Sequence, residues 1–138
     1  MSLSFRQART AHLRLGKRGE NLACSLLRTK NFEILCRNYK VKSGEIDIVA
    51  RDGGIIAFVE VKTRRHTTRS RPARGLSEEQ KKRIYRAGMR YLKAIGNPKV
   101  VYRFDLIEII LSPFRLREAR HWQGHFTSNS IFRKSFSN

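Results

Sequence analysis

The stretch from Glu45 to Lys62 constrains the fold of this chain more than any other. Residues 44–50 alternate acidic and apolar side chains, and residues 55–62 are rich in β-branched and aromatic residues. Both patterns are typical of strands. The sequence Asp52-Gly53-Gly54 between them is a tight-turn signal. The stretch therefore predicts a β-hairpin, and with it a protein built around a sheet.

The two faces of this hairpin differ in chemistry. A Gly53-Gly54 turn places Asp47 directly opposite Glu60, whereas an Asp52-Gly53 turn makes the two residues diagonal neighbours. Opposed side chains have Cβ atoms about 4.5–5.5 Å apart, and diagonal ones about 7–8 Å. In both registers one face carries Glu45, Asp47, Glu60 and Lys62. The other face is wholly apolar and must be buried; it carries Ile46, Ile48, Ala50, Ala57, Val59 and Val61.

Periodicity elsewhere predicts the remaining elements. A helix is expected over residues 8–30, with an apolar stripe of Ala11, Leu15, Leu22 and Leu26. A strand is expected over residues 32–39. A second helix is expected from Ser77, where Ser77 and Gln80 form a capping-box pattern, to about Ile95. A further strand is expected over residues 100–111, and the signal weakens beyond Pro113.

The order of these elements predicts an α/β fold. Three consecutive strands are easily joined as an antiparallel meander, and the helix from Ser77 allows a crossover to a strand parallel to the third. The result is a mixed sheet with helices on its faces. We expect a single domain over residues 1–126 and a flexible C-terminal tail over residues 127–138.

The composition of the chain limits the classes of molecule that it is expected to bind. The 138 residues include 30 Lys and Arg against 11 Asp and Glu, a formal charge of +19. Such a charge favours polyanions, most often nucleic acid. No apolar run approaches the roughly 18 residues of a membrane span, and the N-terminal segment lacks the apolar core of a secretory signal. A cytoplasmic protein with no membrane association is expected.

The cysteines and histidines give no metal motif. Cys24 and Cys36 do not fit zinc spacing, so we interpret them as buried free thiols. His121 and His125 lie four residues apart without an accompanying third ligand. We interpret them as surface histidines.

The acidic face of the hairpin has two interpretations. Opposed like charges on a sheet are destabilising, so a cation between Asp47 and Glu60 would relieve them. Mg²⁺ prefers carboxylate and carbonyl oxygens with water, so the carbonyl of Val61 is a further candidate ligand. Lys62 lies on the same face, where it can orient an attacking water or stabilise a transition state. The alternative is a solvated strand face with an ordinary Glu–Lys ion pair.

Asp47 followed by Glu60-Val61-Lys62 resembles the D-x(n)-E-x-K core of the PD-(D/E)XK nucleases, and the predicted αβββαβ order matches their common core. Three segments make the resemblance more specific. They are Gly44-Glu45-Ile46-Asp47-Ile48-Val49-Ala50, Phe58-Val59-Glu60-Val61-Lys62-Thr63-Arg64 and Arg103-Phe104-Asp105-Leu106-Ile107. Over residues 16–110 the chain is similar to the bacterial YraN-like family, which is related in fold to archaeal Holliday-junction resolvases.

The resemblance implies a restriction-endonuclease-like fold and a metal-dependent site for Mg²⁺ or Mn²⁺. Its catalytic residues would be Asp47, Glu60, Lys62 and Glu20, and its metal ligands Asp47, Glu60 and Val61. Glu20 enters through the resemblance, and Gly16 beside it leaves room for a phosphate. The other interpretation pairs Glu20 with Lys17 or Arg28.

Several roles stay open at this stage. In the family either a Gln or a Lys near the second helix can face the site, and the sequence does not choose between Gln80 and Lys81. Asp105 is better interpreted as an ion-pair partner of Arg103 than as a third metal ligand. Glu45 is either an outer ligand or a structural partner of a basic residue.

Two basic zones flank the candidate site, and they are suited to sequence-independent phosphate contacts. Their candidate nucleic-acid-binding residues are Arg64, Arg65, Arg69, Arg71, Arg74, Lys81, Lys82 and Arg83. The leading hypothesis is a metal-dependent endonuclease acting on DNA, branched or damaged. The rivals are a non-catalytic nucleic-acid-binding protein that retains the fold, and an adaptor that docks on a nucleoprotein. The choice between DNA and RNA and the presence of a homodimer are left open.

Overall fold

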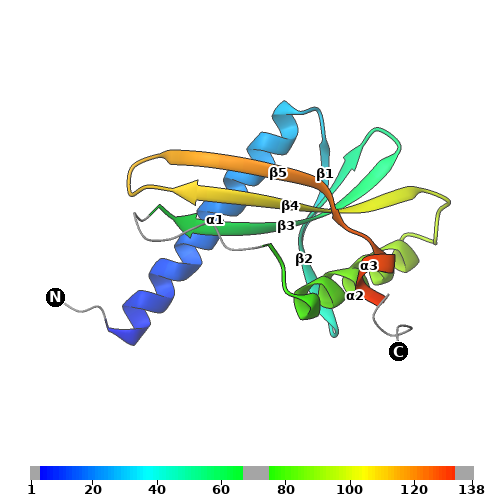
Figure 1. The fold of residues 1–138 in the computed structure, drawn as a ribbon, viewed down its shortest axis with the longest axis horizontal. Coiled ribbons are helices and arrows are strands. Elements are labelled where there is room, and N and C mark those ends of the chain that lie inside the picture. Colours follow the sequence, from blue (N-terminus) through cyan, green and yellow to red (C-terminus); the bar gives the residue numbers. More distant parts are fainter. Residues whose placement is uncertain (1–3, 67–74, 133–138) are drawn as a thin grey trace.

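A mixed sheet with the strand order β1-β2-β3-β4-β5 lies at the centre of the structure (Figure 1). The computed structural model describes residues 4–66 and 75–132. Their helices and strands are α1 (Phe5–Thr29), β1 (Glu33–Val41), β2 (Gly44–Asp52), β3 (Ile55–Arg65), α2 (Glu78–Ala94), β4 (Val101–Leu111), β5 (Leu116–Phe126) and α3 (Ser128–Phe132). The order begins αβββαβ, which confirms the predicted α/β class and is consistent with a restriction-endonuclease-like core.

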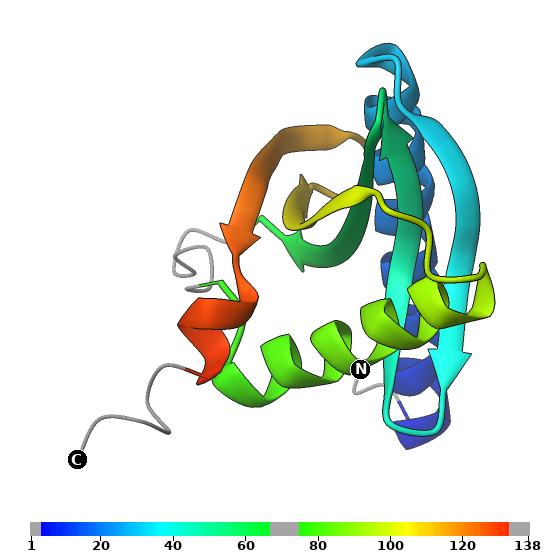
Figure 2. The ribbon, with the colours of Figure 1, turned by 90° about the vertical axis from the view of Figure 1, so that its right-hand side faces the viewer.

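The strand pairing follows the predicted connections. β1, β2 and β3 form an antiparallel meander, and β4 lies parallel to β3 after the α2 crossover. α2 begins as predicted, because the Ser77 hydroxyl accepts from the Gln80 N–H while the Gln80 side chain accepts from the Ser77 N–H. Figure 2 shows α2 running beneath the strands and α1 standing behind them. The two helices therefore cover different faces of the sheet.

Each face of the sheet has its own core. On the α1 side, Ala23 and Leu27 pack with Val59 and Ile107. On the α2 side, the rings of Phe58, Phe104, Tyr102 and Phe126 form an aromatic cluster, and Tyr91 of α2 packs edge-on against Phe58. α2 approaches these rings closely because Gly88 has no side chain, and a Cβ there would lie 3.1 Å from the Phe58 ring.

The hairpin confirms the first of the two predicted registers. Asp52 pairs with Ile55 around the Gly53-Gly54 turn, and the pairing continues to Ile48 opposite Val59. Beyond that pair β2 leaves β3. Gly44, at the far end of β2, lies so close to α2 that a Cβ there would clash with the Arg83 carbonyl oxygen. Contact with α2 thus holds this end of β2 away from β3.

The separation of β2 from β3 changes the composition of the predicted apolar face of the hairpin. Ile48, Ala50, Ala57 and Val59 are buried on the α1 side as expected, whereas Ile46 is buried in the α2-side core. The alternation predicted one apolar face because it assumed a flat hairpin. β2 turns away from β3 before Ile46, so the side chain reaches the other core.

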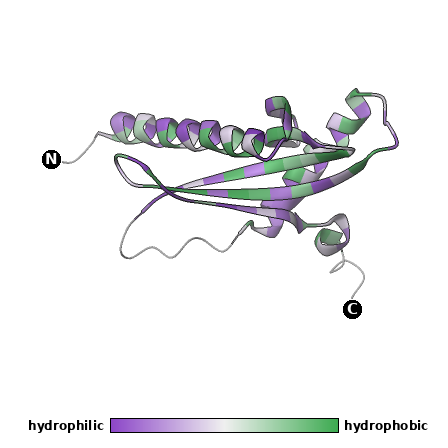
Figure 3. Cartoon of the chain, turned by 90° about the horizontal axis from the view of Figure 1, so that it is seen from above, coloured by the Kyte–Doolittle hydropathy of each residue, from purple (hydrophilic) through white to green (hydrophobic). Residues whose placement is uncertain are grey.

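α1 differs from its prediction in length and in its buried face. It starts at Phe5, with Ser4 as N-cap, rather than at residue 8. Its fully buried residues are Gly19, Ala23, Cys24 and Leu27, while Leu15, Leu22 and Leu26 of the predicted stripe are only partly buried. Small residues let the helix approach β3, since a Cβ at Gly19 would clash with Thr63. Hydrophilic and hydrophobic residues alternate along α1 in Figure 3.

The C-terminal part of the chain contains more structure than the sequence predicted. β5 pairs antiparallel with β4, and α3 follows where a flexible tail was expected from Thr127. Ile131 of α3 is only 3% exposed, so the tail prediction was wrong up to Phe132. Residues 133–138 lie outside the described part of the chain. No helix of the described residues is both long and apolar enough to span a membrane.

Candidate active site

The site lies where β2 separates from β3. The register places Asp47 opposite Glu60 just beyond the last paired residues, and the two carboxyls share a hydrogen bond. The N–H of Val61 donates to Asp47 Oδ2 at 2.8 Å. The strand edge that β2 leaves open therefore holds two carboxyl groups in direct contact.

The surroundings of Asp47 and Glu60 disfavour the ionised form of both carboxyl groups. Burial raises the pKa of Glu60 to about 9, and repulsion from Asp47 adds to the rise. Burial also raises the pKa of Asp47, although the Val61 N–H and the hydrogen bond with Glu60 oppose this. Two carboxyls this close do not readily ionise together, so the pair as a whole resists losing its second proton.

Lys62 gives this pair only weak relief. Its Nζ lies 3.9 Å from Glu60 Oε1, at the outer limit of an ion pair. The ammonium is partly exposed, so solvent screens the interaction. The expected Glu60–Lys62 proximity is present, and the lysine stays available to a third group.

Glu20 faces the same groove from α1, and its partners differ from both predicted ones. Its Oε1 accepts hydrogen bonds from Arg37 Nη2 and Asn38 Nδ2, each at 3.0 Å. Neither Lys17 nor Arg28 is its partner in these contacts. Burial raises the pKa of Asp47 most, and the charge of Glu20 raises it further, so Glu20 belongs electrostatically to the site.

Arg37 and Asn38 are functional candidates that the sequence analysis missed. Asn38 lies in β1 opposite Asp47 and has a φ of 53°, a left-handed conformation uncommon outside glycine but tolerated by asparagine. Local strain of this kind clusters at functional sites. The available signal was an asparagine inside a predicted strand, where asparagine is depleted.

A groove of about 860 Å³ opens between α1 and the β2–β3 gap. Among its lining residues are Gly16, Glu20, Glu45, Asp47 and Lys62. At Gly16 an added Cβ would meet nothing within 4 Å. The open space expected beside Glu20 is therefore present, on the side from which a ligand would approach.

A smaller hollow of about 170 Å³ reaches the same carboxyls from α2. It is lined by Glu45, Asp47, Glu60, Gln80, Arg83 and Ile84. Lys81 instead pairs with Glu78 and lies over the Phe126 ring. Of the two residues between which the sequence did not choose, Gln80 therefore lines the hollow beside the carboxyls and Lys81 does not.

The donor set suits a hard cation only in part. Among residues 4–66 and 75–132, no three His, Cys, Asp or Glu side chains form a ready-made metal cage. Two carboxylates with a main-chain carbonyl and water are nevertheless a ligand set that Mg²⁺ accepts, because it keeps several waters. Two adjoining acids that resist ionisation together also gain from a cation between them. The residues present therefore fit a two-carboxylate magnesium site.

The candidate nucleic-acid-binding residues divide into two groups around the site. Arg64 and Arg65 close the end of β3, and Lys82 and Arg83 lie in the first turns of α2. Lys81 is engaged by Glu78, as described above. Arg69, Arg71 and Arg74 lie outside the described residues.

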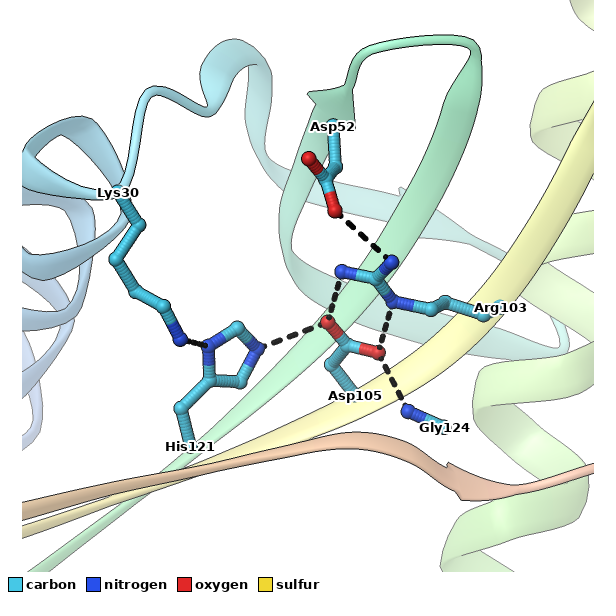
Figure 4. A network of polar contacts seen from close by, with 6 residues as sticks. All are labelled: Lys30, Asp52, Arg103, Asp105, His121 and Gly124. Atoms are coloured by element: carbon cyan, nitrogen blue, oxygen red, sulfur yellow. Dashed lines mark hydrogen bonds and ion pairs between the residues drawn. The ribbon is translucent and has the colours of Figure 1, made fainter.

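Asp105 belongs to a separate network on the α1 side of the sheet (Figure 4). Its carboxylate accepts from Arg103 at 2.9 and 3.2 Å, from His121 at 2.9 Å and from the Gly124 N–H at 3.0 Å. Arg103 also binds Asp52, and Lys30 Nζ lies 2.6 Å from His121 Nδ1. We call these six residues the Asp105 clamp. The ion-pair interpretation of Asp105 is confirmed.

The prediction for His121 was wrong. Its side chain is only 3% exposed, whereas the sequence suggested a surface histidine. The spacing to His125 carried no information about burial, which depends on the pairing of β5 with β4. Cys24 and Cys36 are free, as predicted, although Cys36 is only half-buried.

We expect the stability of the metal-free protein to fall as the pH rises from about 5 to 9. The unfolded chain loses the Glu60 proton near its ordinary pKa of 4.5, whereas the folded chain keeps it to about 9. The folded state then binds more protons, and stability decreases as the pH rises. Urea unfolding across this range measures the slope. Glu60→Gln should flatten it, and Glu33→Gln, an exposed control, should not.

The αβββαβ order, the mixed sheet and the acidic pair at the β2–β3 gap define an α/β protein with a fold consistent with a restriction-endonuclease-like core. The model of the uncharacterised protein family UPF0102 matches residues 19–109. The chain belongs to the UPF0102 family, which confirms the resemblance to the YraN-like proteins.

Individual relatives support this assignment. A UPF0102 protein of Chlorobium phaeobacteroides is 41% identical over 117 residues, which cover 85% of this chain and 93% of that protein. A UPF0102 protein of Dictyoglomus turgidum is 44% identical over 99 residues, covering 72% and 84%. A UPF0102 protein of Chlorobaculum parvum is 38% identical over 109 residues, covering 79% and 84%.

Proposed function

We propose that the protein is a metal-dependent endonuclease that hydrolyses phosphodiester bonds in DNA, branched or damaged. One observation carries the proposal: Asp47 and Glu60 are buried against each other, and among the described residues the cation paired with them, Lys62, lies 3.9 Å from Glu60. A purely structural site gains nothing from two buried acids that resist ionising together. A cation site does, because the ion binds both ionised carboxylates and its binding free energy offsets their mutual repulsion.

Asp47 and Glu60 would hold Mg²⁺ or Mn²⁺, with the Val61 carbonyl as a further ligand. When bound, such an ion lowers the pKa of a coordinated water and stabilises negative charge on a phosphate. The Val61 N–H fixes one oxygen of Asp47, so this carboxylate is oriented before any ligand arrives. Pre-organised ligands of this kind avoid reorganisation during the reaction.

Lys62 and Glu20 complete the proposed site from two sides. The Lys62 ammonium would donate to a phosphate oxygen, where negative charge increases in the transition state. Glu20 would accept a hydrogen bond from water in the groove, which holds that water for attack. Arg37 and Asn38 position Glu20 through its Oε1 and act as positioning residues.

The choice of a nucleic-acid substrate follows from charge. A formal +19 favours a polyanion, and Arg64, Arg65, Lys82 and Arg83 lie on both sides of the carboxyl pair. The described residues contain no recognition helix or zinc finger, so we expect contacts to phosphates rather than to base edges. The same surface suits RNA, and the experiment below includes it.

The test is a cleavage panel. Linear, nicked, flapped and four-way DNAs, and matched RNAs, are incubated with the protein in Mg²⁺, in Mn²⁺ and in EDTA. We expect metal-dependent cleavage of at least one DNA. No cleavage of any substrate in either metal, by a preparation that binds DNA, would contradict the endonuclease.

A second function is favoured by one contact. Arg37 neutralises Glu20, as expected for a nucleic-acid-binding protein that retains the fold without turnover. Such a protein would bind the panel with equal affinity in metal and in EDTA and leave every substrate intact. Metal-enhanced binding or cleavage would exclude it.

A further inference from the structure

A second concavity, of about 620 Å³, lies between the end of β3 and the β4–β5 hairpin. Its basic lining residues include Arg64, Arg65, Arg115, Arg117 and Arg120, and we call it the arginine pocket. It shares no lining residue with the groove that contains Asp47. Three of its arginines come from the β4–β5 hairpin, a part of the chain that the nuclease resemblance does not cover.

The hydrogen-bonding capacity of the pocket is not met by the described residues. Arg64 Nε is buried and has no hydrogen-bond partner among them. Glu108 of β4 does not line the pocket, but it is only 3% exposed, leaves its oxygen Oε2 unpartnered and interacts electrostatically with Arg64 and Arg120. Buried polar atoms in folded proteins nearly always have a partner, and a bound ligand can supply it. An oxyanion bound in the pocket would accept a hydrogen bond from Arg64 Nε and so supply the partner that this donor lacks.

The charge balance of the pocket also favours an anion. Five guanidiniums converge there, and the acid that lines it, Glu118, is paired with Arg120. Burial raises the pKa of Glu108, although Arg64 and Arg120 oppose the rise, so this acid neutralises less of their charge. Converging like charges are unfavourable unless a counter-charge lies between them.

The position of the pocket links it to the candidate active site. Arg64 lies two residues beyond Lys62 on β3, which corresponds to about 7 Å along the strand. Glu108 of β4 pairs with Lys62 on one side and with Arg120 on the other. Nucleotides advance by roughly 3.4 Å along a duplex axis. A backbone that presents one phosphate to Lys62 would therefore reach the arginine pocket within about two or three nucleotides.

We propose that the arginine pocket binds the phosphodiester backbone of the nucleic acid, next to the phosphate held at Asp47 and Glu60. The identity of the ligand rests on the proposed function. Planar guanidiniums bind pairs of phosphate oxygens through two parallel hydrogen bonds, which an ammonium cannot do. The pocket thereby fixes the path of one strand past the site, and adds affinity without reading bases.

The test compares two double variants of equal charge. Arg115→Gln with Arg117→Gln alters two exposed arginines of the pocket. Arg28→Gln with Lys99→Gln removes two exposed charges that line neither the pocket nor the groove. Duplex DNA binding is measured in EDTA at several salt concentrations. The pocket variant should lower the log–log salt slope by about 1.8, from two contacts at roughly 0.9 each. The control should leave it near the wild-type value.

Two further comparisons distinguish paired hydrogen bonds from charge alone, and backbone phosphates from terminal ones. Arg115→Lys with Arg117→Lys keeps the charge and loses the paired hydrogen bonds, so it should bind between wild type and the glutamine variant. Duplexes with 5′-phosphate and 5′-hydroxyl ends test the kind of phosphate. We expect the pocket variant to lose the same amount of affinity for both kinds of duplex. A loss confined to the phosphorylated duplex would overturn the proposal. Equal salt slopes for the two double variants would overturn it as well.

The proposal for the arginine pocket and the proposal of endonuclease activity are tested by different measurements. If wild type cleaves DNA while the pocket variant keeps the full salt slope, the pocket is rejected and the enzyme stands. If the slope depends on the pocket but no substrate is cleaved, the enzyme is rejected and the binding site stands. Absence of any DNA binding by wild type overturns both.

Discussion

Asp47→Asn is expected to abolish metal-dependent cleavage while leaving the metal-free protein at least as stable as wild type. The change removes, at nearly constant shape, the acid that hinders the ionisation of Glu60. The asparagine oxygen can still accept from the Val61 N–H that Asp47 engages at 2.8 Å. A metal supplies several kcal/mol of transition-state stabilisation, and each 1.4 kcal/mol corresponds to a factor of about ten. A loss of about a thousandfold or more follows.

The measurement combines cleavage rates with melting curves in EDTA and in millimolar Mg²⁺. Wild type should gain stability with the metal, because a ligand bound only by the native state stabilises it. Asp47→Asn should lose that gain. Asp52→Asn is the matched control, since Asp52 lies at the other end of the same strand and is 37% exposed. A loss of several kcal/mol by Asp47→Asn in EDTA would sink the metal-site interpretation and indicate a structural acid instead.

Asp105→Asn is expected to destabilise the protein by about 3–5 kcal/mol, the usual cost of breaking a buried charge pair. The Asp105 side chain is fully buried, and that of Arg103 is 17% exposed. Asparagine has one acceptor oxygen and no negative charge. It therefore cannot accept from Arg103, His121 and Gly124 as the carboxylate does. Arg103 then keeps its contact with Asp52 but loses its buried counter-charge.

Urea unfolding at neutral pH measures this loss, with Asp52→Asn again as control. Asp52 binds the same arginine from a partly exposed position, so its loss should cost less than about 1 kcal/mol. Burial alone would raise the pKa of Asp105, but bonds from His121, Arg103 and Gly124 hold it below its ordinary value of 3.8. The contribution of Asp105 is therefore present above pH 3.8 and lost as the pH falls through the lower, folded-state pKa. A pH-independent difference between wild type and Asp105→Asn would contradict this assignment.

The hairpin was predictable because it depends on local signals. Alternation of side chains and the Asp52-Gly53-Gly54 turn placed Asp47 and Glu60 on one face and reduced the register to two alternatives, between which the structure decides. The crossover followed from a capped helix between two apolar strands. β5 was not predictable by the same means, because an edge strand with exposed side chains carries a weak hydrophobic period. α3 was missed for a similar reason, since its burial depends mainly on Ile131.

The site was predictable only where it depends on one hairpin. The contacts of Glu20 with Arg37 and Asn38 depend on how α1 docks against β1, which no local pattern specifies. β1 also shifts register between Ile34 and Cys36, and a one-residue shift moves side chains to the other face. The burial of His121 and the arginine pocket both require the β4–β5 pairing. The roles of Asp47, Glu60, Lys62 and Glu20 remain proposals that cleavage and melting measurements test.

The Asp105 clamp has a consequence for the order in which the chain acquires its structure. Its members extend from Lys30 to Gly124, and the bond between Lys30 and His121 spans 91 positions. Contacts between such distant positions slow folding, because the chain must close a long loop before they form. A nascent chain that ends with β4 has Arg103 and Asp105 but neither His121 nor Gly124. Folding should therefore be a late event in synthesis, completed when the last strand emerges.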